Sequence, residues 1–207
     1  MTPAGPNAIE RAHSRFVFSR RVRVLAEHLA RRVAPSARVV DVGCGDGRVG
    51  AALTRLRPDI SIRGFEVLPR EATRIPVEPF DGRRLPLESG AADTVLLIDV
   101  VHHALHPDEL LAEAARVAGT QLVVKDHRCD RFLARPLLRF MDRIGNARHG
   151  VALPYDYWKK ERWERAFDAV GLEVVDWDSK LKLYPVPADF LFGGSLQFIA
   201  VLRSRPI

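Results

Sequence analysis

The chain has 207 residues and a formal net charge of +6, with 47% hydrophobic and 28% charged residues. This composition is typical of one globular domain with a sizeable core, which we expect to span 1–207, and no run approaches the roughly 18 apolar residues of a membrane-spanning helix. The positive charge permits attraction to nucleic acid, anionic lipid or an acidic substrate but selects none of them.

The first part of the chain alternates between helical and strand patterns. Apolar residues at helical spacing over 9–33 predict one long or two short helices, which form an N-terminal helical extension at 8–34. The next predicted elements are a strand at 38–42, a helix at 47–57, a strand at 60–67, an irregular stretch at 68–80, a strand at 94–101, a helix at 107–118 and a strand at 121–125. Strands alternating with helices predict a parallel sheet covered on both faces, with a cofactor-binding core at 37–126.

The pattern changes beyond this core, in the region 127–195 that we expect to form the substrate side. Helices are predicted at 131–144 and 159–170, and two last strands at 172–177 and 196–202. Tyr155, Tyr157, Trp158 and Trp163 form an aromatic cluster, which is either a lid over the substrate or an anchor that fastens a helix to the sheet. The whole pattern predicts an α/β fold, a Rossmann-like, doubly wound and mostly parallel seven-stranded sheet whose last strand is antiparallel.

The stretch VVDVGCGDGRVG, residues 39–50, is a strand that runs into glycines. Gly45–Gly50 satisfies the G-x-G-x-x-G pattern, and Glu66 follows Gly45 by 21 residues, so the spacing alone fits a nicotinamide-binding oxidoreductase. Asp41 opposes that interpretation, because its charge would lie near the pyrophosphate of a dinucleotide. Beside a cationic ligand the same carboxylate would be favourable.

Three further stretches extend the pattern, namely GFEV, DGRRLPL and ADTVLLIDVVHHALHP. In joint order and spacing with the glycine stretch, they resemble the class I S-adenosylmethionine-dependent methyltransferases, in particular the small-molecule branch called type 11. The resemblance covers about residues 37–125. It implies S-adenosylmethionine as cofactor and methyl transfer as the reaction.

The resemblance also implies roles for single residues. Asp41 lies near the methionine end of the cofactor, Gly43 and Gly45 let the backbone pass beneath it, Glu66 takes the ribose hydroxyls and Asp81 reaches the adenine amino group. The other implied cofactor contacts are Cys44, Val67, Gly82, Arg83, Asp99 and Val100. The cofactor's sulfonium and amino groups suit carboxylates at strand ends. Cys44 beside the glycines is interpreted as a small packing residue rather than a nucleophile.

Three histidines follow the predicted strands and are the candidate catalytic residues. His102 and His103 come after the strand at 94–101, and His127 follows the strand at 121–125, beside Lys125 and Asp126, which could shift its pKa. Any of these imidazoles could take a proton from a hydroxyl acceptor, whereas an amine, thiol or activated carbon needs a base less. The reacting atom therefore stays open. The histidine spacing matches no compact metal motif, so we expect no metal.

The acceptor is expected to be a small or lipid-like molecule. An RNA-directed methyltransferase is the main alternative, but the run Asp99–His102 lacks the prolines of amino-directed nucleic acid methylases, and no nucleic acid module is appended. A non-catalytic cofactor-binding module also stays open. Only two cysteines and no signal-like apolar core lead us to expect a cytoplasmic protein. The basic N-terminal helix either covers the site or touches a membrane surface.

Overall fold

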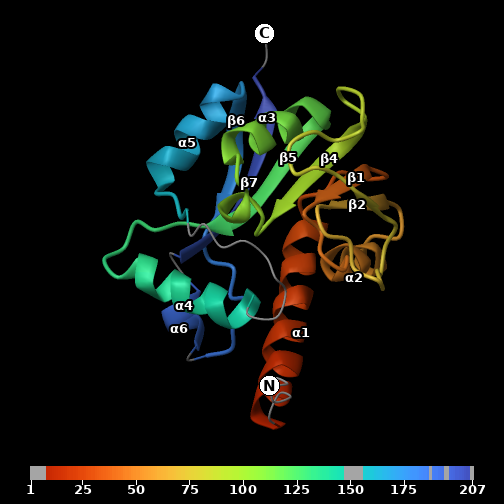
Figure 1. Cartoon of the computed structure of the whole chain (residues 1–207). Helices are drawn as coiled ribbons and strands as arrows, with labels where there is room; N and C mark the ends of the chain where they lie inside the picture. The colour runs from red at the N-terminus through yellow and green to blue at the C-terminus, as the bar shows by residue number, and fades with distance from the viewer. Residues whose placement is uncertain (1–7, 147–155, 187, 194–195, 206–207) are drawn as a thin grey trace.

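The computed structural model describes residues 8–146, 156–186, 188–193 and 196–205. Its centre is a seven-stranded sheet in the order β3-β2-β1-β4-β5-β7-β6 (Figure 1). The strands are β1 (Arg38–Val42), β2 (Ser61–Glu66), β3 (Val77–Pro79), β4 (Ala92–Ile98), β5 (Ala118–His127), β6 (Leu172–Asp178) and β7 (Gln197–Ser204). Neighbouring strands from β3 to β5 are parallel, and β7 is antiparallel to both of its neighbours. The predicted Rossmann-like sheet with a last antiparallel strand is confirmed.

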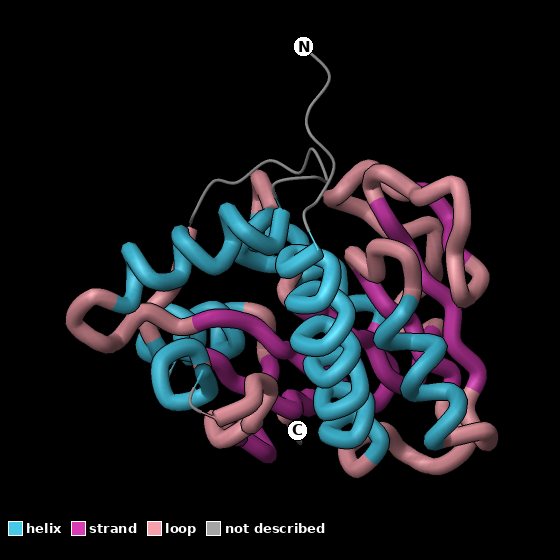
Figure 2. Tube along the Cα trace, turned by 90° about the horizontal axis from the view of Figure 1, so that it is seen from below, coloured by secondary structure: helices cyan, strands magenta, loops and turns pink. Residues whose placement is uncertain are grey.

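Helices cover both faces of the sheet (Figures 1 and 2). They are α1 (Ala8–Ala30), α2 (Arg48–Leu56), α3 (Pro107–Val117), α4 (Ala134–Asn146), α5 (Lys160–Ala169) and α6 (Ala188–Phe192), with a 3-10 turn η1 (Val101–His103). Leu25 and Leu29 of α1 pack with Leu53 of α2 in one core, while α3 and α5 contribute to the other. The helical segment at the N-terminus is therefore one helix that forms part of a covering layer. No described helix is long and apolar enough to span a membrane.

Several predicted boundaries differ from the structure. The predicted irregular stretch at 68–80 contains β3, a three-residue edge strand that ends at Pro79, where the missing N–H prevents further pairing. β4 ends at Ile98 rather than at Val101, which begins η1. β5 begins at Ala118, directly after α3, and is longer than predicted at both ends. The early end of β4 matters most, because it turns the histidines that follow it over the end of β5.

The strand register brings the candidate residues together. Val42 at the end of β1 lies opposite both Phe65 of β2 and Leu97 of β4, and Ile98 lies opposite Lys125 of β5. The carboxyl ends of these four strands therefore meet at one edge of the sheet, where open α/β sheets bind ligands.

Candidate active site

The glycine turn after β1 is built for close backbone approach. Gly43 has φ +70°, its N–H donates to the Phe65 carbonyl at 2.7 Å, and a Cβ at this position would lie 2.3 Å from Val100 Cγ2. Gly45 also has a positive φ, but a Cβ there would meet no atom within 4 Å. Val100 thus closes one side of the turn, and Gly45 faces open space from which a ligand can approach.

Two carboxylates flank this turn. Asp41 is only 2% exposed, and its Oδ1 has no hydrogen-bond partner among the described residues. Burial, and then the nearby charge of Glu66, raise the pKa of Asp41 to about 7. Glu66 accepts hydrogen bonds from the N–H groups of Gly45 (2.7 Å) and Val67 (2.9 Å). Since neither carboxylate forms an ion pair with a described side chain, the turn offers negative charge to a cation.

Cys44 has a packing role in this turn. Its sulfur lies against Gly64, where an added Cβ would come within 2.3 Å of it. Burial first, and then Asp41 and Glu66, raise the pKa of the thiol, so the nucleophilic thiolate is disfavoured. These contacts support the interpretation of Cys44 as a packing residue.

The turn after β3 forms the outer end of the site. Asp81 Oδ1 accepts the N–H groups of Arg83 (2.8 Å) and Arg84 (2.7 Å), which lowers the pKa of Asp81. A Cβ at Gly82, which has φ +82°, would lie 3.3 Å from Val67 Cγ2, so these two predicted cofactor contacts face each other. The side chain of Arg83 turns towards α3, where its Nε donates to Glu109 at 2.8 Å. Only the backbone of Arg83 therefore belongs to this turn.

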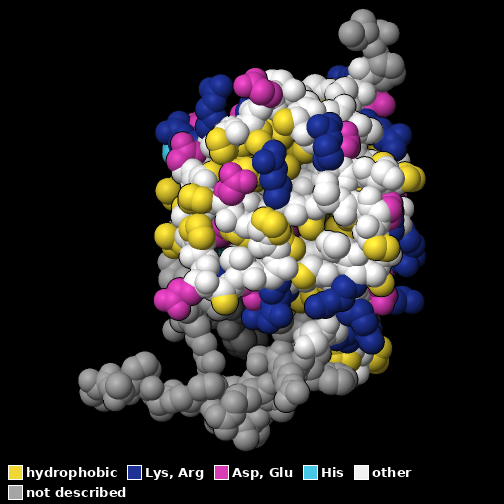
Figure 3. All heavy atoms as spheres, turned by 90° about the vertical axis from the view of Figure 1, so that its right-hand side faces the viewer, with side chains coloured by type: hydrophobic (Ala, Val, Ile, Leu, Met, Phe, Trp, Pro, Cys, Tyr) yellow, Lys and Arg dark blue, Asp and Glu magenta, His cyan; other side chains and the backbone are white. Residues whose placement is uncertain are grey.

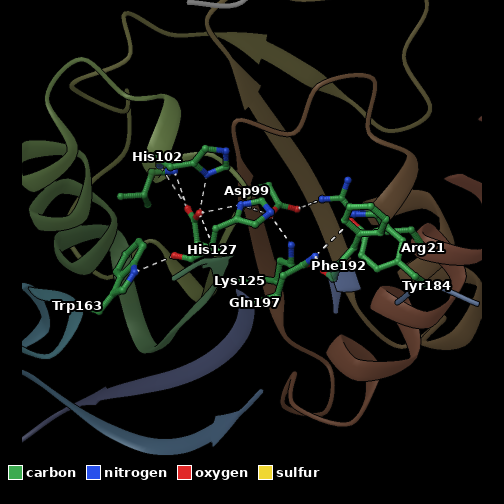
Figure 4. Close-up of polar contacts among 11 residues, drawn as sticks. Arg21, Asp99, His102, Lys125, His127, Trp163, Tyr184, Phe192 and Gln197 are labelled. Atoms are coloured by element: carbon green, nitrogen blue, oxygen red, sulfur yellow. Dashed lines mark hydrogen bonds and ion pairs between the residues drawn. The ribbon is translucent and has the colours of Figure 1, made fainter. Parts of the chain in front are cut away.

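Asp99 lies in an ion-pair cluster rather than beside the glycine turn alone (Figure 4). Its carboxylate pairs with Arg21 of α1 at 2.5 Å and with Lys125 of β5. Lys125 is fully buried, and burial lowers its pKa to about 8 against the opposing effect of Asp99. Asp99 has φ +53°, a conformation uncommon outside glycine, which indicates that surrounding contacts hold it in place. The sequence gave no sign that Arg21 reaches this site.

Asp126 holds the histidines in place (Figure 4). Its Oδ1 accepts from His102 Nδ1 at 2.5 Å and from the His127 N–H at 2.6 Å, while Oδ2 accepts the N–H groups of Val101 and His102 at 3.2 and 3.4 Å. Burial alone would raise the pKa of Asp126, but His102 and His127 lower it further than burial raises it. The carboxylate is therefore ionised and fixes the tautomer of His102, because a carboxylate can only accept.

His127 and His103 lie on either side of His102. The ring centroid of His103 is 3.9 Å from that of His102, and the ring of His127 meets His102 edge-on at 4.8 Å. His127 Nδ1 lies 3.6 Å from Asp126 and 3.7 Å from Asp99, beyond hydrogen-bond distance. Burial lowers the pKa of His127, so this ring is neutral near pH 7. All three predicted histidines therefore gather in one cluster.

The same cluster contains donor atoms that could in principle hold a metal. Ligand atoms of His102, Asp126 and His127 lie within 4.8 Å of one another. However, each oxygen of Asp126 already accepts two N–H groups, which occupies the lone pairs that a metal would need. This donor set favours proton handling over metal binding.

The aromatic cluster resolves into packing residues where it is described. Trp158 and Trp163 are buried in the core with ring centroids 4.6 Å apart, and Trp163 Nε1 donates to the His127 carbonyl at 3.0 Å. Tyr157 is also buried and stacks on His102 at 5.8 Å. Tyr155 lies outside the described residues. The anchor interpretation therefore fits the two tryptophans, which brace the end of β5.

A family model described as a methyltransferase domain matches residues 12–176, which is most of the chain. The chain belongs to this methyltransferase family. No curated protein matches the sequence.

Solved structures extend the comparison to the whole fold. The PH0226 protein from Pyrococcus horikoshii resembles this methyltransferase at 16% identity with a TM-score of 0.68, over 97% of this chain and 100% of that one. A SAM-dependent methyltransferase from Thermotoga maritima is 22% identical with a TM-score of 0.63, over 95% and 98% of the two chains. A chain of the complex between the Haloferax volcanii Trm112 methyltransferase activator and its candidate methyltransferase is 17% identical with a TM-score of 0.66, over 97% and 95%. These likenesses show the fold, and the family match identifies a SAM-dependent methyltransferase.

The first turn of the site fits S-adenosylmethionine, the cofactor of this methyltransferase family. The cofactor carries a sulfonium and an ammonium group, and Asp41 provides a buried acid with an unpartnered oxygen. Gly45 supplies the open backbone approach. The contacts assigned to single residues, from Asp41 to Val100, remain predictions.

Proposed function

We propose that this methyltransferase transfers a methyl group from S-adenosylmethionine to a hydroxyl group of a small or lipid-like acceptor. His102 would act as the general base, and Asp126 would be its positioning residue. The observation that supports this proposal is the 2.5 Å hydrogen bond between His102 Nδ1 and an ionised, buried Asp126.

The chemistry of the base follows from this hydrogen bond. When bound, the cofactor supplies a methyl group already activated by the sulfonium. A hydroxyl acceptor must lose its proton as it attacks, and with Nδ1 donating to Asp126 the remaining ring nitrogen of His102, Nε2, is the atom that can take that proton. The charge of Asp126 then stabilises the imidazolium, and the buried position of His102 excludes water from the reacting groups.

His127 is the competing candidate for the base. Its lowered pKa keeps it neutral near pH 7, but no carboxylate lies within hydrogen-bond distance of its Nδ1 to fix the ring. We therefore assign the base to His102 and expect His127 to line the acceptor side.

The test compares His102→Ala, Asp126→Asn and His127→Ala with His106→Ala, a change at a half-exposed histidine outside the cluster. Acceptors are first screened with the wild-type enzyme by the mass gain of one methyl group. We expect His102→Ala to reduce turnover by about 10²–10⁴-fold, the usual contribution of a general base, and to leave the affinity for S-adenosylhomocysteine unchanged in calorimetry. Full turnover of His102→Ala together with a large loss in His127→Ala would transfer the base to His127.

An RNA acceptor is the alternative that the net charge keeps open. On the face drawn in Figure 3, Lys and Arg side chains are interspersed with Asp and Glu over much of the surface. Several arginines are paired with carboxylates, among them Arg38 with Asp93 and Arg57 with Asp59. This distribution differs from the continuous basic stripe of a nucleic acid interface. RNA binding that weakens steeply with added salt would favour the alternative.

A further inference from the structure

The segment between β5 and α4, residues 128–133, projects from the body of the molecule at the left of Figures 1 and 2. Two large apolar side chains stand at its end, Phe132 with 94% and Leu133 with 66% of their surface exposed. Leu133 has φ +68°, which is uncommon for a residue with a side chain. We call Phe132 and Leu133 the apolar tip.

The apolar tip is presented by a well-anchored base. The N–H groups of Arg128 and Cys129 donate to the carbonyls of Leu196 and Trp158, both at 3.0 Å. Asp130 accepts the N–H of Lys160 at 2.9 Å. On the other side, α4 begins with Ala134 buried in a small core, together with Leu138 and Tyr157. The chain on both sides of the tip is thus fixed to the sheet, so exposure of the tip is a property of the fold rather than of a frayed loop.

Positive charge surrounds the apolar tip. Arg131, Arg135 and Arg139 are exposed around it, at its base and along the first turns of α4. The one acid of the projecting segment, Asp130, is paired with Arg128 at 2.9 Å. An apolar tip with a basic surround matches the two layers of an anionic membrane surface, an apolar interior beneath phosphate groups.

We propose that the apolar tip inserts into the interface of an anionic lipid bilayer, with Arg131, Arg135 and Arg139 at the level of the lipid phosphates. A second copy of the chain fits this surface less well, because a stable protein interface buries about 800 Å² per partner and two side chains cannot supply that area. A bilayer needs only the tip and the charges. Phe132 follows His127 by five residues, so docking would bring the acceptor side of the site to the membrane.

The experiment is co-sedimentation of the whole protein with vesicles of phosphatidylcholine alone or mixed with phosphatidylglycerol. The test variant is Phe132→Ser with Leu133→Ser, and the matched control is Leu56→Ser, a half-exposed leucine at the end of α2 on another side of the molecule. Circular dichroism and thermal unfolding check that all proteins fold. We expect wild type and control to bind the anionic vesicles, weakly or not at all the neutral ones, and the double variant to lose roughly tenfold or more in partitioning.

A second variant tests the charges. Arg131→Glu should weaken binding to anionic vesicles by about tenfold, and added salt should weaken wild-type binding in the same direction. The proposal is overturned if folded wild type does not sediment with anionic vesicles, or if the double variant binds as strongly as wild type. Self-association of wild type that the double variant abolishes, without vesicle binding, would instead assign the tip to a second copy. None of these outcomes depends on which acceptor the enzyme methylates.

Discussion

Asp41 places a carboxylate in the buried end of β1, where the fold offers it no cation. Its pKa is raised to about 7, so near neutral pH the cofactor-free protein holds this acid partly protonated. A bound sulfonium and ammonium favour the ionised form. Cofactor binding must therefore release a proton over the pH range in which Asp41 is still protonated in the free protein.

The first prediction at the residue scale follows from this release. The affinity for S-adenosylmethionine should rise with pH below about 7, by up to tenfold per unit, and level off above it. Calorimetry at several pH values, in buffers of different ionisation enthalpy, measures both the affinity and the proton release. Asp41→Asn should bind weakly and lose the slope assigned to Asp41. A wild-type affinity that does not change between pH 5.5 and 8, flagged here as roughly the range around that pKa, would contradict this role.

Single residues also show what the sequence could predict about the site. Asp41, Glu66 and the three histidines could be located because each follows or ends a strand pattern, and parallel strands end at one edge. The link between Asp126 and His102 could not, since it depends on β4 ending at Ile98 and turning η1 over β5. Arg21 gave no signal because it is one of many arginines in α1.

At the scale of the elements, the glycine turn joins β1, β2 and η1. Gly43 and Gly45 both have a positive φ, but only Gly43 is packed, against Val100 at the start of η1. The two glycines thus separate backbone strain from steric contact in otherwise similar positions.

We expect Gly45→Ala to lower the free energy of unfolding by about 1 kcal/mol, the usual order for a side chain forced into positive φ. Gly43→Ala should cost at least about 2 kcal/mol more, because the new Cβ must also displace Val100. Urea unfolding of both variants gives the difference. Equal losses would mean that η1 yields without cost, and the close packing between turn and η1 would then not constrain the site.

The elements also show where sequence patterns are sufficient. Long, periodic segments such as α3 and the apolar run of β4 were predicted nearly to their ends, because their buried faces determine them. β3 was missed, since three residues at a sheet edge bury too little to leave a pattern. Its pairing with β2 is decided by the neighbouring strand rather than by its own residues.

At the scale of the whole molecule, ionisable groups make opposing contributions to stability. Asp99 and Asp126 have pKa values below the ordinary range, so they stabilise the fold above about pH 4 and lose that contribution as the pH falls. Asp41 acts in the other direction. Its folded pKa lies above its unfolded value, so its contribution falls as the pH rises from about 4 to about 7 and stays low above that.

Asp41→Asn isolates this contribution, and we expect the variant to be more stable than wild type in the absence of cofactor. The difference in unfolding free energy should be near zero at about pH 4 and reach an order of 2 kcal/mol at about pH 8, since one unit of pKa shift corresponds to roughly 1.4 kcal/mol. Adding S-adenosylhomocysteine should reverse the order at neutral pH, because saturating ligand at about 100 times its Kd adds roughly 2.7 kcal/mol to wild type and little to a variant that binds weakly. Thermal unfolding with and without the ligand measures both effects. If wild type were the more stable protein without ligand at pH 8, Asp41 would already have a counter-charge within the fold, and its acid would be structural rather than held ready for the cofactor.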